Sequence, residues 1–91
     1  MALLDLLGRR AALRVIWELR GGERMTFRAL VDAADTNPSV LNARLAELRE
    51  AGVVDHGEDE GYGLTKDGTK LLDGLMPLHA WAEAWARRAG S

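Results

Sequence analysis

The sequence contains no cysteine, only two prolines and no long apolar run. Without cysteine, the chain can form neither disulfides nor thiolate metal sites, and it has no thiol with which to sense oxidants. A membrane-spanning helix needs about 20 largely apolar residues, and no such stretch occurs. The start of the chain, MALLDLLGRR, lacks the charge order and cleavage site of a secretory signal peptide. We therefore expect a cytoplasmic protein without thiol redox chemistry.

Patterns that carry catalysis are also missing. The sequence has no recognisable Ser/His/Asp set, paired carboxylates, phosphate-binding loop or metal cluster, and its histidines, His56 and His79, are far apart. We expect no enzymatic activity, no cofactor and no metal. The 91 residues make one domain, residues 1–91. Because a chain of this length buries only about 60–65% of its unfolded surface, dimerisation would be a natural source of stability.

Charge is distributed unevenly along the chain. The formal net charge of −2 is not the basic balance that is typical of nucleic-acid binding. However, residues 1–28 carry six arginines against three acids, whereas residues 55–65 carry four acids and no Lys or Arg. Basic residues are therefore concentrated in the N-terminal part, and acidic residues in one short later segment.

The stretch NPSVLNARLAELREAG, residues 37–52, predicts the central helix. Asn37 is a strong N-cap, Pro38 suits the first helical position, and Gly52 is placed to end the helix. The helix, about residues 37–51, has one apolar stripe formed by Leu41, Leu45 and Leu48. Because the opposite face is small or polar, it is free to meet a partner.

Three shorter helices are predicted before this one. They span residues 2–7, 9–20 and 26–34. Gly21-Gly22 ends the second of them, and Thr26 is a plausible N-cap of the third. The expected buried side of the second helix is Leu13, Ile16 and Trp17, with Leu19 as a further candidate. A helix of about nine residues, a short turn and a longer helix have the spacing of a helix-turn-helix.

A short hairpin and a helical C-terminus are predicted next. The candidate strands, residues 53–56 and 62–65, are separated by an acidic turn. Met25 lies in an extended piece that could pair with the hairpin as a third strand. After Thr65 we expect a helix, then a kink or break near residues 73–77 because Pro77 removes a helical hydrogen bond, and then a final helix to about residue 89.

The chain resembles the HxlR-type transcriptional regulators, within the wider MarR/ArsR-like winged-helix group. The residues that carry the resemblance are Leu7-Gly8, Phe27, Leu30, Leu41-Asn42-Ala43-Arg44-Leu45, Glu47-Leu48, Gly52-Val53-Val54, Leu64-Thr65, Gly68, Leu71 and Trp81. The resemblance implies a mainly α (α+β) winged helix-turn-helix and a homodimeric DNA-binding regulator. Its implied parts are N-terminal helices (1–20), helix-turn-helix (26–52), wing hairpin (53–65) and C-terminal dimerisation helices (66–89).

The candidate DNA contacts are Arg28, Asn37, Ser39, Asn42 and Arg44. Ser39 and Asn42 can hydrogen-bond to base edges, and Asn suits adenine. Arg44 lies beside the apolar stripe and is better aimed at a phosphate, which the helix N-terminus at Asn37 could also hold. An ordinary solvated helix face is the alternative interpretation.

The candidate dimer contacts are the apolar residues of the two terminal segments, Leu3, Leu7, Leu78, Trp81 and Trp85. They provide more apolar surface than so small a domain can cover, and tryptophans often anchor interfaces. Tryptophans could instead line an effector pocket, but aromatic residues at helical spacing more often belong to a core or an interface.

The acidic turn favours a second hypothesis for function. A wing that lies along DNA should be basic, because contacts with phosphates dominate the attraction between protein and DNA. Here the wing carries Glu58, Asp59 and Glu60, which would repel the phosphates. Arg24 and Arg28, beside the third helix, could supply the contacts that the wing lacks. The alternative is a winged-helix protein-interaction module with little DNA affinity.

Overall fold

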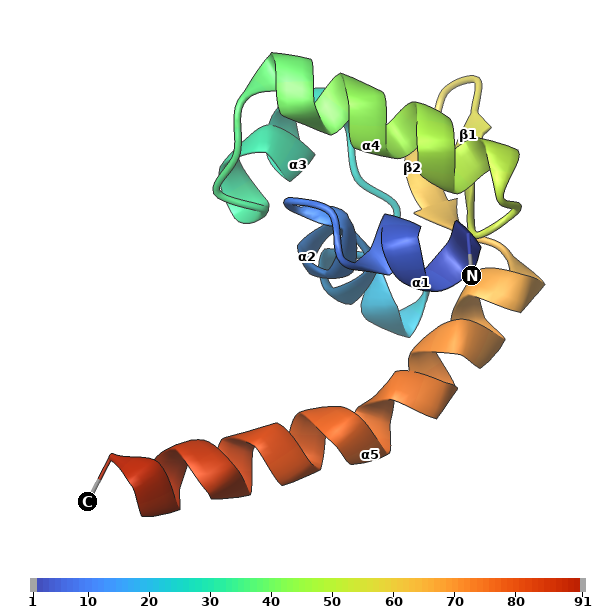
Figure 1. The fold of residues 1–91 in the computed structure, drawn as a ribbon. Coiled ribbons are helices and arrows are strands. Elements are labelled where there is room, and N and C mark those ends of the chain that lie inside the picture. Colours follow the sequence, from blue (N-terminus) through green and yellow to red (C-terminus); the bar gives the residue numbers. More distant parts are fainter. Residues whose placement is uncertain (1, 91) are drawn as a thin grey trace.

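The computed structural model describes residues 2–90 and consists mainly of helices (Figure 1). Its elements are α1 (Ala2–Leu7), α2 (Ala12–Glu18), the 3₁₀ turn η1 (Arg20–Gly22), α3 (Phe27–Ala33), α4 (Pro38–Glu50), β1 (Val54–Gly57), β2 (Gly61–Leu64) and α5 (Lys66–Ala89). This is the predicted order. The outermost positions of the predicted domain, 1 and 91, lie outside the described residues.

Helix α4 begins and ends as its sequence predicts. The Asn37 side chain accepts a hydrogen bond from the Val40 N–H at 2.9 Å, and Pro38 occupies the first turn. Gly52 follows the helix with φ 77°, a left-handed conformation that glycine adopts without steric cost. The leucine stripe is buried and therefore fixes which face of α4 points outward.

The helix-turn-helix is closed by a second cap and a tight turn. The Thr26 hydroxyl accepts a hydrogen bond from the Ala29 N–H at 3.1 Å, as predicted for the start of α3. Asp35, in the turn, has φ 51°, which Asp tolerates better than most residues. The Thr36 N–H donates to the Val31 carbonyl, and the chain then enters α4.

The core lies where α2, α3 and α4 meet. Its most completely buried side chains are Val15, Ile16, Leu19, Leu30, Leu41 and Leu48. The prediction of a buried Leu13 is wrong, because Leu13 is 46% exposed. Helix α2 starts only at Ala12, since Ala11 has a left-handed φ of 70°. Its buried face then consists of Ala12, Val15, Ile16 and Leu19, and Leu13 falls beside that face.

The wing is a two-stranded antiparallel hairpin with one additional bridge. Its register runs from Val54 opposite Leu64 to Gly57 opposite Gly61. Met25 and Tyr62 exchange two backbone hydrogen bonds, of 2.9 and 2.8 Å. The predicted pairing of Met25 with the hairpin is therefore confirmed, and it connects the wing to the start of α3.

Helix α5 is continuous, so of the two predicted alternatives near Pro77, a kink or a break, the break does not occur. The Thr65 hydroxyl accepts the Gly68 N–H at 3.0 Å and caps the first turn. Pro77 removes one hydrogen-bond donor, which a bend can accommodate without ending a helix. Figure 1 shows α5 changing direction in its middle, after which the C-terminal half projects from the body of the domain. No helix within residues 2–90 is long and apolar enough to cross a membrane.

Candidate nucleic-acid interface

The outward side of α4 is the candidate reading face. It consists of Ser39, Asn42, Ala43, Ala46, Arg49 and Glu50, all exposed, and we call it the outer face of α4. Figure 1 places α4 along one edge of the molecule, with α3 near its start and the wing near its end. Ser39 and Asn42, two of the predicted contacts, therefore lie together on an accessible surface.

The N-terminus of α4 keeps one backbone donor for an anion. Pro38 has no N–H, and the Val40 N–H is already bonded to the Asn37 side chain. The Ser39 N–H therefore remains as the first-turn donor, and it could donate a hydrogen bond to a phosphate. The side chain of Asn37, although exposed, acts as the cap and holds this turn in place.

Arg44 lies on the flank of α4 that faces the N-terminal segment. Its side chain is only 15% exposed, and its Nε lies 2.9 Å from Glu47 Oε1. This contact is an ion pair without hydrogen-bond geometry, since both atoms lack a hydrogen-bond partner. Arg9 reaches the other oxygen of Glu47 at 3.3 Å. Arg44 would have to leave Glu47 to contact a phosphate, so its predicted role stays a prediction.

Two other arginines are better exposed. Arg28, in the first turn of α3, is exposed, as a phosphate contact must be. Arg49 is exposed in the last turn of α4, and sequence reasoning missed it. The signal was present, because Arg49 follows Asn42 by seven residues and so lies on the same side of the helix. Neither arginine makes an ion pair within residues 2–90.

Arg24 binds the wing instead of facing solvent beside α3. Its Nη2 lies 2.5 Å from Asp55 Oδ1 and 2.9 Å from the Gly61 carbonyl oxygen, and its Nε lies 3.5 Å from Glu60 Oε2. Gly63 makes room for this guanidinium, which a Cβ at that position would overlap. Two of the four wing acids are thus paired, and Glu58 and Asp59 remain exposed at the tip.

The predicted dimer residues divide into two groups. Leu7 is buried in the core of its own domain, and Leu3 is 38% exposed on α1. Leu78, Trp81 and Trp85 are 52–60% exposed on α5. The apolar surface available to a partner therefore lies mainly on the C-terminal half of α5.

The fold is similar to that of a solved structure. A possible HxlR family transcriptional factor from Thermoplasma volcanium GSS1 superposes with a TM-score of 0.85 and 25% sequence identity, over 96% of this chain and 84% of the other. No protein-family model and no curated protein matches the sequence. The predicted winged-helix fold class and the resemblance to the HxlR-type regulators are confirmed by this similarity.

Proposed function

We propose that this chain is a DNA-binding transcriptional regulator that acts as a homodimer on a pseudo-palindromic double-stranded site, with α4 in the major groove. The observation that carries the proposal is the outer face of α4. All residues of this face are exposed, and three buried leucines hold the helix to the body of the domain. Similarity to a transcription factor supports the proposal by analogy. The cytoplasmic location stays a prediction.

Four exposed polar side chains contact DNA in this complex. Asn42 hydrogen-bonds to an adenine edge, and Ser39 contacts a neighbouring base or phosphate. Arg28 and Arg49 bind phosphates on either side of the groove and fix the register of the domain. Ala43 and Ala46, in the middle of the face, contact only thymine methyl groups. Direct reading of the sequence therefore depends chiefly on Asn42.

Binding should be weak for a regulator, because few cations take part. A plot of the logarithm of the observed binding constant, Kobs, against the logarithm of salt concentration has a slope of about −0.9 for each phosphate neutralised. If Arg28 and Arg49 are the arginines of each subunit that contact DNA, a dimer neutralises about four phosphates, which gives a slope of about −3 to −4. A slope near zero would mean that the protein does not bind DNA electrostatically.

A gel-shift titration tests the function, using DNA from upstream of the protein's own gene and a scrambled duplex. Asn42→Ala should weaken binding to the specific duplex by about 1–3 kcal/mol and leave binding to the scrambled duplex unchanged. Arg49→Ala should weaken both alike. Lys70→Ala, an exposed change on α5, is the matched control and should alter neither. Equal loss on both duplexes for Asn42→Ala would contradict base reading by this residue.

The second candidate function is a protein-interaction module with little DNA affinity. It is favoured by the exposed acids at the wing tip, Glu58 and Asp59, which would repel phosphates. A basic protein surface would complement this tip. The same titration discriminates the two functions, because an interaction module would bind neither duplex at low salt.

A further inference from the structure

An ion cluster joins α4 to the turn that follows α1. Glu47 Oε1 lies 2.9 Å from Arg44 Nε on the same helix, and Glu47 Oε2 lies 3.3 Å from Arg9 Nη1. Arg9, Glu47 and residues of α1 also line one cleft, so this contact lies where α1 runs beside α4 (Figure 1). We call Arg9, Arg44 and Glu47 the Glu47 cluster. Its two cations and one carboxylate give it a net charge of +1.

The two arginines of the Glu47 cluster differ in exposure. The side chain of Arg44 is 15% exposed, whereas that of Arg9 is 55% exposed. Arg44 is therefore the counter-charge of Glu47, and the surplus positive charge of the cluster faces solvent on Arg9. Because an ion pair as exposed as that of Arg9 contributes little to stability, its main consequence is the place where it holds the Arg9 guanidinium.

Glu47 lies at one edge of the outer face of α4. Residues three and four apart are neighbours on a helix surface, so Glu47 borders Ala43 and Glu50 of that face. Arg49 lies at the other edge, because two residues correspond to about 200° around a helix, or about 160° measured across the outer face. Arg9, held by Glu47, and Arg49 therefore lie at opposite edges of the face that would enter the groove.

A helix in the major groove lies between two sugar-phosphate strands, one along each edge. At one edge α4 itself supplies a cation, Arg49. At the other edge α4 supplies Ala43, Glu47 and Glu50, and these acids would repel phosphates. Arg9 places a cation at this second edge. Because a guanidinium has five N–H donors, Arg9 can bind Glu47 and a phosphate at the same time.

We propose that Arg9 binds a phosphate of the double-stranded site at this edge, and that Glu47 is the positioning residue that holds the Arg9 guanidinium there. The inference rests on the proposed DNA binding, and it adds a contact from the N-terminal segment to those of α3 and α4. A dimer then neutralises about six phosphates instead of four, which steepens the salt slope to about −5. Arg44 keeps its place beside Glu47 in this complex.

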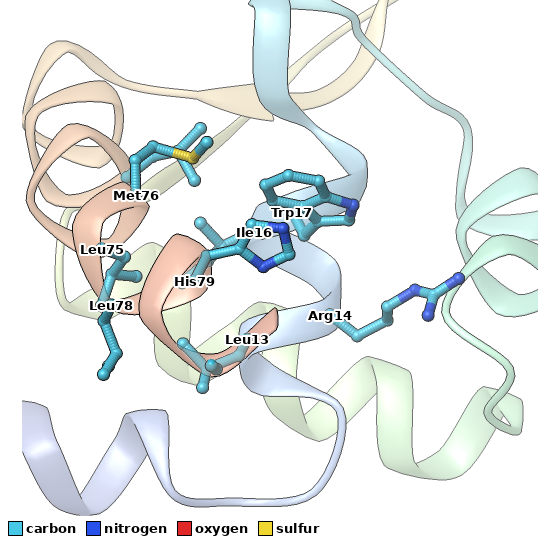
Figure 2. Close-up of a pocket in the computed structure, with 10 residues that line it drawn as sticks. Leu13, Arg14, Ile16, Trp17, Leu75, Met76, Leu78 and His79 are labelled. Carbon is cyan, nitrogen blue, oxygen red and sulfur yellow. The ribbon is translucent and has the colours of Figure 1, made fainter. Parts of the chain in front are cut away.

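The gel-shift titration, repeated at several salt concentrations, tests the Arg9 contact. Arg9→Ala should weaken binding to the specific and the scrambled duplex alike and flatten the salt slope by about 2, because two phosphates per dimer lose their cation. Arg9→Lys keeps the charge and should keep the slope. Arg14→Ala is the matched control, because the Arg14 side chain is 57% exposed and also pairs with a glutamate, Glu18. Arg14 lines a groove between α2 and α5 (Figure 2), so its loss should alter neither affinity nor slope.

A second pair of variants tests the positioning role of Glu47. Glu47→Gln and Glu50→Gln each remove one negative charge from the same edge, but Glu50 makes no ion pair in the part of the chain that the structure describes. Both should strengthen binding by relieving repulsion. The gain from Glu47→Gln should be about two- to tenfold smaller, because Arg9 must then be ordered on binding. In an Arg9→Ala background the two variants should have equal effects.

The possible failures have distinct meanings. If the unmodified protein binds but Arg9→Ala behaves like Arg14→Ala, or Arg9→Lys flattens the slope as Arg9→Ala does, the Arg9 contact is overturned and the proposed function stands. Equal gains from Glu47→Gln and Glu50→Gln beside an intact Arg9 would overturn positioning by Glu47. If the unmodified protein binds neither duplex at low salt, the proposed function fails, and this contact fails with it. Circular dichroism first verifies that each variant is folded.

Discussion

Two glycines of α5 should respond in opposite directions to the same substitution. Gly68 lies in the first turn, where α5 meets the wing, and it is buried. A Cβ at Gly68 would overlap the Val53 carbonyl oxygen and lie 3.1 Å from its carbon. Gly74 lies in the next turns of the same helix, and a Cβ there would meet nothing within 4 Å. Gly68→Ala and Gly74→Ala therefore form a matched pair.

The magnitudes follow from two opposing effects. Replacing a helical glycine by alanine stabilises a protein by about 0.5–1 kcal/mol, because the unfolded chain loses freedom. At Gly74 nothing opposes this gain. At Gly68 the obstacle is backbone, which cannot swing away like a flexible side chain, and overpacking of this kind costs about 3 kcal/mol. We expect Gly68→Ala to destabilise the fold by about 2 kcal/mol overall.

Urea unfolding followed by circular dichroism, at one fixed protein concentration, measures both variants. The fixed concentration matters because association would shift apparent stability. In thermal unfolding, Gly74→Ala should raise Tm by about 2–8 °C, and Gly68→Ala should lower it by about 10 °C. If the two variants changed stability equally, the close contact between α5 and Val53 would not exist in solution.

Four further substitutions test the wing and its arginine. Arg24→Met should destabilise the fold by about 1–2 kcal/mol, a value lowered because its acidic partners are exposed. Arg28→Met, an exposed change, should alter the unfolding free energy by less than about 0.5 kcal/mol. Equal effects of the two variants in urea unfolding would show that Arg24 does not hold the wing in place. Neutralising the tip with Glu58→Gln and Asp59→Asn should strengthen DNA binding and steepen its salt dependence if the wing approaches phosphate. Weaker binding in the gel shift would show that these acids contribute to the site.

The features predicted from the sequence are those set by near neighbours. Asn37 caps a helix through an N–H three residues away, and Leu41, Leu45 and Leu48 share a face by their spacing alone. The hairpin is likewise local, and its predicted strands differ from the observed ones by about one residue at their ends.

Other features depend on contacts between distant parts of the chain, which periodicity does not contain. The position of Arg24 beside α3 suggested a phosphate contact. In the structure Arg24 instead binds Asp55 of the wing, 31 residues away. Glu47, which pairs with Arg44 on the same helix, is also reached by Arg9 from the N-terminal segment. The prediction that Leu13 is buried was wrong for another reason, because the left-handed conformation of Ala11 delays the start of α2.

The contact between the outer face of α4 and DNA can be tested most directly by nuclear magnetic resonance. A chain of 10.0 kDa gives resolvable backbone amide signals, which can be followed as a duplex from upstream of its gene is added. We predict the largest shifts at Ser39, Asn42 and Arg49, a smaller shift at Arg28, and shifts that vanish at high salt. Saturable shifts confined to the wing tip, or none at low salt, would contradict the account.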